Sequence, residues 1–143
     1  MRVSDGGRKA AGFKVKAGDC ACRAVAIATG KPYREIYDLI NEVAKAEGKP
    51  KKKRKGKGVS SARSGVYRET MDLIMASLGW SWVPTMKVGQ GCKVHLRADE
   101  LPSGRIVVRL SRHYAAVIDG ILHDDHDSSR GGTRCVYGYW KEI

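Results

Sequence analysis

Hydrophobic residues in the first half of the chain recur every three or four positions, which is typical of amphipathic helices. The run CACRAVAIAT at residues 20–29 is alanine-rich and closed by a glycine, so it predicts a short buried helix with a glycine stop. Residues 32–47 carry one apolar face at helical spacing and predict a second helix. A third helix is expected over 65–78, with Ser64 as its cap and Gly79 as its stop.

The second half of the chain changes to short β-branched or aromatic runs separated by turn residues, the pattern of strands. The predicted strands cover residues 80–84, 105–110, 113–118, 121–124 and 134–140. Helices first and strands last predict an α+β domain, with N-terminal helices packed on a C-terminal antiparallel sheet. The 143 residues fit one domain, which we place at 19–143. Residues 1–18 are polar and glycine-rich and are interpreted as a flexible N-terminal arm.

The Asp-Gly dipeptide at 119–120 predicts a β-hairpin, because it suits a two-residue turn between two strands. If the residues on either side of this dipeptide pair, the register brings His113 and Asp124 to the same face of the sheet, diagonal to each other. Asp125 then falls on the opposite face, and His126 lies across from His113. The register alone therefore selects Asp124 as the carboxylate able to orient His113.

Cys20 stands at the start of the first predicted helix, after Asp19, which is a reasonable helix cap. Unpaired N–H groups at a helix start favour a thiolate, and the same groups, that of Ala21 among them, could hold an oxyanion. A nucleophilic thiol also needs a nearby base. His113 is the candidate base, and Asp124 is the acid that would hold it in place.

The same residue types could instead bind a metal ion. Cys20 and Cys22 are spaced Cys-x-Cys, and Cys92 and His95 are spaced Cys-x-x-His, but only the second pair fits the spacing of structural zinc sites. The acidic run at 123–127 alternates between two faces of a strand and cannot easily surround one cation. We therefore predict neither a metal nor another cofactor.

Neither a signal peptide nor a membrane-spanning stretch is recognised in the sequence. The protein is expected in a cytosol, or packaged from one into a virion, without a membrane partner. In that setting the four cysteines, including Cys135, are expected to be thiols.

The chain carries 27 Lys and Arg against 15 Asp and Glu, a net charge of +12. Much of the excess is concentrated in a basic loop predicted at 48–63. The basic residues proposed to bind a polyanion are Lys49, Lys51, Lys52, Lys53, Arg54, Lys55 and Lys57. This loop could bind nucleic acid or an acidic protein with strong salt dependence, or it could be a solvated flap. No aromatic residue interrupts the run, so base stacking is not supported.

The segments AGDCACRAVAIATG and RHYAAVIDGILHD resemble papain-like cysteine peptidases, and are most similar to the peptidase domains that process bacteriocin leaders. The whole chain is also similar to small proteins of bacteriophages and prophages, in the stretches GKPYREIYDLI, LGWSWVPTMKVGQGCKVHLRADELP and RCVYGYW. The resemblance implies a papain-like fold with Cys20 as nucleophile, His113 as general base and Asp124 as orienting acid. Such peptidases carry a glutamine about six residues before the cysteine to complete the oxyanion hole. Here that position is Lys14, which could supply a charge-assisted hydrogen bond instead.

These observations predict a thiol hydrolase acting on a peptide, an isopeptide or another amide such as a peptidoglycan crosslink. The alternative is a catalytically inactive papain-like phage structural or accessory protein, whose lysine-rich loop binds nucleic acid, an acidic partner or other virion proteins. A third interpretation is a host-directed effector that acts on or blocks a bacterial protein.

Overall fold

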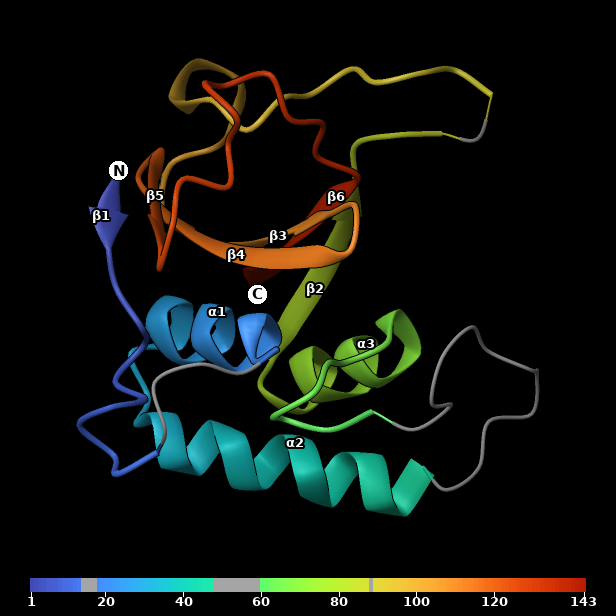
Figure 1. Ribbon diagram of the computed structural model, residues 1–143. Helices are drawn as coiled ribbons and strands as arrows, with labels where there is room; N and C mark the ends of the chain where they lie inside the picture. Colours follow the sequence, from blue (N-terminus) through green and yellow to red (C-terminus); the bar gives the residue numbers. More distant parts are fainter. Residues whose placement is uncertain (14–17, 48–59, 88) are drawn as a thin grey trace.

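The computed structural model describes residues 1–13, 18–47, 60–87 and 89–143, and these residues form a mixed α+β fold (Figure 1). The helices are α1 (Cys20–Thr29), α2 (Tyr33–Glu47) and α3 (Arg68–Ser77), with a short 3-10 helix at Ala98–Glu100. The strands are β1 (Arg2–Val3), β2 (Trp80–Pro84), β3 (Arg105–Leu110), β4 (His113–Ile118), β5 (Ile121–Asp124) and β6 (Gly138–Glu142). The predicted α+β class is confirmed.

The six strands form one sheet in the order β1-β5-β4-β3-β6-β2, antiparallel except for the pairing of β1 with β5. Helix α1 lies against the sheet, with α2 beyond it, and long loops cover the other face (Figure 1). Because side chains alternate along strands, each face has its own core. Val107 and Trp140 pack with the helices, whereas Val108 and Val117 pack under the loops.

The first two helices form where the sequence predicts them, and α1 ends at Gly30 with a left-handed backbone (φ 73°). Helix α3 begins at Arg68, later than the predicted start at residue 65, and its N-cap is Tyr67 rather than Ser64. Ser64 instead lies in a turn, where its backbone N–H donates to Ser61 Oγ at 3.0 Å. None of the helices in the described ranges is long and apolar enough to cross a bilayer.

The predicted register of the β4–β5 hairpin is confirmed: Ile118 pairs with Ile121. Asp119 and Gly120 have φ values of 49° and 80°, which a two-residue primed turn requires. The final strand, predicted at 134–140, is shifted: β6 begins only at Gly138.

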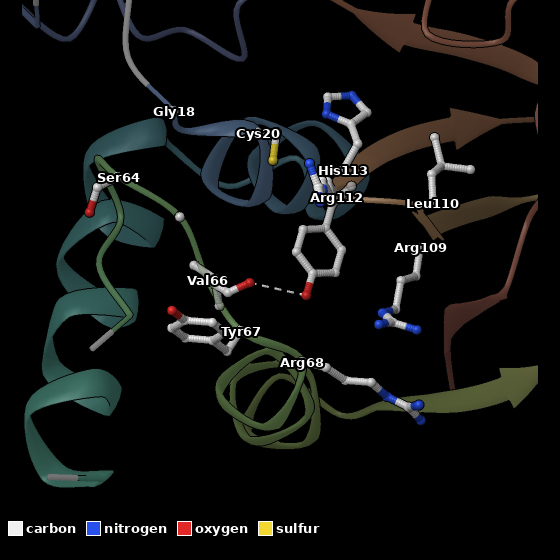
Figure 2. A pocket seen from close by; sticks show the side chains of 12 residues that line it. Gly18, Cys20, Ser64, Val66, Tyr67, Arg68, Arg109, Leu110, Arg112 and His113 are labelled. Carbon is white, nitrogen blue, oxygen red and sulfur yellow. Dashed lines mark hydrogen bonds between the residues drawn. The ribbon is translucent and has the colours of Figure 1, made fainter. Parts of the chain in front are cut away.

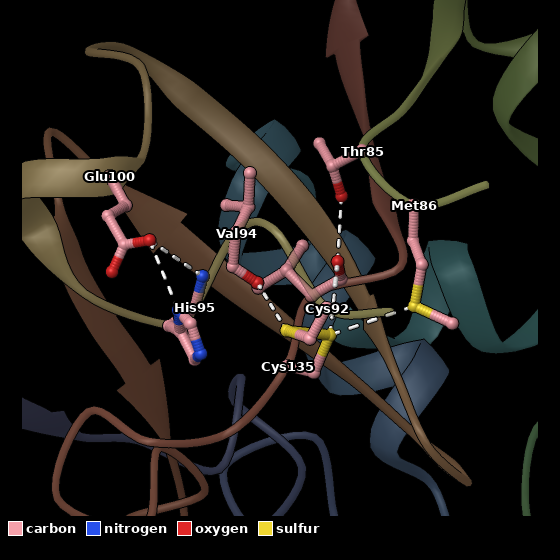
Figure 3. The surroundings of a disulfide bond; sticks show 8 residues. Thr85, Met86, Cys92, Val94, His95, Glu100 and Cys135 are labelled. Atoms are coloured by element: carbon pink, nitrogen blue, oxygen red, sulfur yellow. Dashed lines mark hydrogen bonds and ion pairs between the residues drawn. A yellow bond between two sulfur atoms is a disulfide. The ribbon is translucent and has the colours of Figure 1, made fainter. Parts of the chain in front are cut away.

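The expectation of four thiols is wrong for two cysteines, since Cys92 and Cys135 form a disulfide (Figure 3). Residues 94–96 and 134–136 run side by side, joined by backbone hydrogen bonds such as Val136 N–H to Val94 C=O at 2.8 Å. No local sequence pattern predicts this pairing. It brings the Cα atoms of the two cysteines to 5.8 Å from each other. Cys20 and Cys22 are free.

The interpretation of residues 1–18 as a loose arm is corrected for residues 1–13. Strand β1 pairs with β5, and Arg8 is only 3% exposed, because its guanidinium bonds inside the domain. The end of the predicted basic loop is also packed: the Ala62 N–H donates to Asn41 Oδ1 at 2.9 Å, and Ala62 is buried.

Candidate active site

A cavity of about 670 Å³ opens between the start of α1, the segment 64–68 and the β3–β4 hairpin (Figure 2). Cys20 and His113 both line it. The Tyr114 hydroxyl donates to the Val66 carbonyl at 3.1 Å and so ties the hairpin to the opposite wall. The packing of α1 on the sheet thus brings the two predicted reactive groups to one cavity.

The predicted contact between His113 and Asp124 is present, with Nε2 2.7 Å from Oδ2. Both side chains are largely buried, at 11% and 3% exposed. The Ser128 hydroxyl donates to the same Oδ2 at 2.7 Å, and the Asp125 backbone N–H donates to Oδ1 at 2.8 Å. Both carboxylate oxygens are therefore held in place, which fixes the imidazole in turn.

Burial acts to lower the pKa of His113, but contacts with Asp124 and Cys20 outweigh it and raise that pKa to about 9. Because Asp124 occupies Nε2, Nδ1 is the ring nitrogen left to act on the thiol. Burial acts to raise the pKa of Asp124, yet hydrogen bonds from His113 and Ser128 hold it below its ordinary range. An imidazolium at neutral pH is the partner that stabilises a thiolate.

Arg23 is a member of the site that the sequence interpretation missed. Only 6% exposed, it forms an ion pair with Asp19 one helical turn earlier. Its Nη2 also lies 3.4 Å from Asp124 Oδ1 and 3.4 Å from Asp125 Oδ1. The available signal was a charged residue inside the apolar run 20–29, since such a residue is rarely buried without a partner.

Asp19 precedes Cys20, but its side chain does not cap α1 as predicted. Instead, Oδ2 accepts a 2.6 Å hydrogen bond from the Tyr33 hydroxyl, which itself accepts one from Arg8 Nη1 at 2.5 Å. Burial, followed by the Asp19 hydrogen bond, raises the pKa of Tyr33, so this hydroxyl stays protonated. The buried carboxylate next to the candidate nucleophile is thus held by the Tyr33 hydroxyl and by two cationic partners, Arg8 and Arg23.

The candidate oxyanion groups are only partly covered by the structure. Since no side chain caps α1 within the described ranges, the first-turn N–H groups, including that of Ala21, remain available beside Cys20. Lys14 lies outside the described residues. So do the basic residues proposed to bind a polyanion, from Lys49 to Lys57.

The zinc arrangement considered from the sequence does not assemble. Cys92 is bonded to Cys135, and burial raises the pKa of Cys22 to about 12. Another group does come together: ligand atoms of His113, Asp124 and His126 lie within 4.8 Å of one another. A metal there would have to break the hydrogen bond between His113 and Asp124, so this geometry favours the hydrogen-bonded pair.

The chain was compared with protein-family models, curated proteins and solved structures, and none of them matches it.

Proposed function

We propose that the protein is a thiol hydrolase of the papain-like type, with Cys20 as nucleophile, His113 as proton carrier and Asp124 as the group that holds the imidazole. The observation that carries this proposal is the position of His113. Its ring shares a cavity with a free cysteine at a helix start and is bonded at 2.7 Å to a buried carboxylate. That combination meets the needs of a Cys–His nucleophile.

In the proposed reaction, the Cys20 thiolate attacks an amide carbonyl carbon and forms a tetrahedral intermediate. The first-turn N–H groups of α1 stabilise its oxyanion. The His113 imidazolium gives its proton to the leaving amine, and the C–N bond breaks to leave a thioester. Water then attacks the thioester while His113 takes its proton, which releases the acid and regenerates the thiolate.

The buried charges around the site support this assignment. A carboxylate beside a thiolate would oppose it, but Asp19 pairs with Arg23 and lies 3.6 Å from Arg8 Nη1. Arg23 also approaches Asp124, so one guanidinium supports the residues beside both the nucleophile and the base. The charge of Asp19 is therefore compensated, and it opposes the Cys20 thiolate less in the proposed mechanism.

Substrates in this proposal are peptides, isopeptides or related amides, and no cofactor takes part. The alternative function, binding of nucleic acid or an acidic protein by a non-enzymatic phage protein, depends on residues 49–57. Those residues lie outside the described ranges, so this alternative remains a prediction from the sequence, as do the phage origin and the cytosolic or virion location.

The proposal is tested with p-nitrophenyl acetate and iodoacetamide, which need no knowledge of the natural substrate. We expect a burst of p-nitrophenol and an acetyl group on Cys20, followed by slow release of acetate. We also expect iodoacetamide to alkylate Cys20 at pH values well below about 8.5, where an ordinary thiol is mostly protonated. Alkylation should slow at least about tenfold in His113→Ala, because the charged partner is lost.

Cys22 provides the internal control, since it shares the tryptic peptide AGDCACR with Cys20 and is fully buried. Fragment-ion mass spectrometry of that peptide distinguishes the two sites. Cys22→Ala should keep the burst, and Cys20→Ala should abolish it. Equal, slow alkylation of Cys20 with and without His113 would refute the thiol hydrolase.

A further inference from the structure

Three arginines line the cavity that holds Cys20 and His113: Arg68, Arg109 and Arg112. Among the described residues that line this cavity, none is acidic. Arg68 and Arg109 extend toward the same end of the cavity, whereas Arg112 directly precedes His113 (Figure 2). The space around the reactive thiol is therefore positive, even before His113 is protonated.

Arg112 differs from two exposed arginines elsewhere on the described surface, Arg34 and Arg97, which pair with nearby aspartates. Arg34 lies 3.8 Å from Asp38, and Arg97 lies 3.1 Å from Asp99. In the cavity, Arg112 is exposed and has no ion pair or hydrogen bond within the described ranges. The backbone of Arg112 has φ 56° in the tight β3–β4 turn, and this turn sets the position of its Cα–Cβ bond.

The other two guanidiniums rest on aromatic rings. Arg109 lies 5.4 Å from the ring centre of Tyr137, and Arg68 lies 4.3 Å from that of Trp82. Asp72 approaches Arg68 Nε at 3.6 Å, too far for a hydrogen bond, so this buried Nε has no hydrogen-bond partner in the described residues. Charge at this end of the cavity is thus only partly compensated.

Arg68 and Arg109 also line a second cavity of about 380 Å³. Its remaining walls are apolar or aromatic, formed by Trp82, Pro84, Met86 and Tyr137. The two cavities therefore follow one another: first the thiol and Arg112, then the shared pair of arginines, then an apolar pocket.

From this order of cavities, and resting on the proposed thiol hydrolase, we infer the substrate class. The substrates are peptides with an aspartate or glutamate beside the scissile bond. An aromatic or large apolar residue is the neighbour of that acidic residue in the peptide. The carboxylate binds between Arg112 and the Arg68–Arg109 pair, and the apolar side chain enters the second cavity. Guanidinium groups suit carboxylates because they offer paired donors as well as charge. Water is excluded from the aromatic pocket by the apolar side chain.

The first test compares iodoacetate with iodoacetamide, which alkylate thiols by the same displacement of iodide but differ in charge. For Cys20, we expect the ratio of the two rate constants to exceed that of free cysteine by roughly tenfold at low salt, because a positive cavity concentrates the anion. The excess should shrink as salt is added. The excess should also be smaller in Arg109→Gln and in Arg112→Gln. Because both reagents react with the same thiol, the ratio is independent of any change in the reactivity of that thiol.

Arg105→Gln is the matched control, since Arg105 is on the same strand as Arg109 but donates to the Ile27 carbonyl at 3.2 Å outside the cavity. It should keep the full ratio. A Cys20 that reacts with both reagents at the ratio of free cysteine overturns this inference and leaves the hydrolase standing. A Cys20 that reacts with neither overturns both.

The second test asks for the peptide itself. Acetyl-Glu-Trp-amide and acetyl-Trp-Glu-amide cover both chain directions, and each is paired with its Gln counterpart. We expect at least one Glu peptide to protect Cys20 from iodoacetamide at roughly tenfold lower concentration than its Gln counterpart, a difference lost in Arg109→Gln. Equal protection by the Glu and Gln peptides, or no protection by any of them, contradicts the inferred substrate class.

Discussion

Folding raises the pKa of His113 and so changes its charge at neutral pH. Burial alone would lower its pKa, and the neighbouring Asp124 and Cys20 raise it to about 9. In the unfolded chain its pKa is about 6.5. A pKa raised in the folded state means that protonation stabilises the fold, fully below about pH 6.5, and that this stabilisation is lost as the pH rises through about 9.

We therefore expect His113→Gln to reduce the free energy of unfolding most at and below neutral pH. The loss should be on the order of 2 to 3 kcal/mol at pH 6.5 and should decline toward zero by about pH 9.5. Urea unfolding of the wild type and the variant at several pH values measures this difference. His95→Gln, which changes a histidine outside the cavity, serves as the control and should not reproduce the decline. A difference that stays constant with pH would show that His113 is not held as an imidazolium.

At the scale of elements, α1 is attached to the sheet by buried charge as well as by apolar packing. Arg23 on α1 contacts Asp19 at the helix start and Asp124 at the end of β5. Removing one member of such a network leaves its partners charged and buried, which costs more than the intact pairs contribute. Arg23 therefore couples the position of the candidate nucleophile to that of its base.

Arg23→Met should lower the free energy of unfolding by about 3 to 5 kcal/mol, because the buried carboxylates of Asp19 and Asp124 both lose a buried cationic partner. The matched control is Lys31→Met, which removes an exposed cation lying 4.0 Å from Glu35. Surface pairs of this kind contribute about 0 to 1 kcal/mol, so the control should unfold almost as the wild type does. Urea unfolding at pH 7 compares the two. Equal, small losses in both variants would remove the structural role assigned to Arg23.

For the whole molecule, the Cys92–Cys135 disulfide joins the loop after β2 to the segment before β6, across a separation of 43 residues. It lies among the loops over the sheet face opposite α1, near Val94 and Val136 (Figure 3). Closing a loop of this length restricts the unfolded chain, which stabilises the folded state.

In the double variant Cys92→Ala and Cys135→Ala, we expect the free energy of unfolding to fall by up to about 4 kcal/mol, the loop-entropy limit for this separation. The rate of Cys20 alkylation at neutral pH should not change, since the disulfide does not line the cavity. Thermal and urea unfolding, with and without a reductant, provide the measurement. Reductant should destabilise the wild type and leave the double variant unaffected; a wild type indifferent to reductant would contradict the prediction.

The sequence by itself determined the features that depend on neighbours along the chain. An alanine-rich apolar run closed by a glycine placed α1, and apolar spacing placed α2, because a helix repeats its faces every 3.6 residues. The Asp-Gly turn fixed the hairpin register, and with it the contact between His113 and Asp124, which are only 11 residues apart. The predicted start of α3 was wrong, because Ser64 forms a local turn with Ser61 instead of capping the helix.

Only the tertiary structure decided which distant groups meet. Arg23 and Asp124 are 101 residues apart, and the arginines of the cavity come from α3, β3 and the turn after β3. The disulfide and the burial of Arg8 depend likewise on how loops and the N-terminal strand lie on the sheet. Periodicity specifies which face of an element is buried, but not which other element covers it. That choice depends on the combined packing and charge of the folded domain, so the candidate Cys–His pair could be named from the sequence while the network and cavity around it could not.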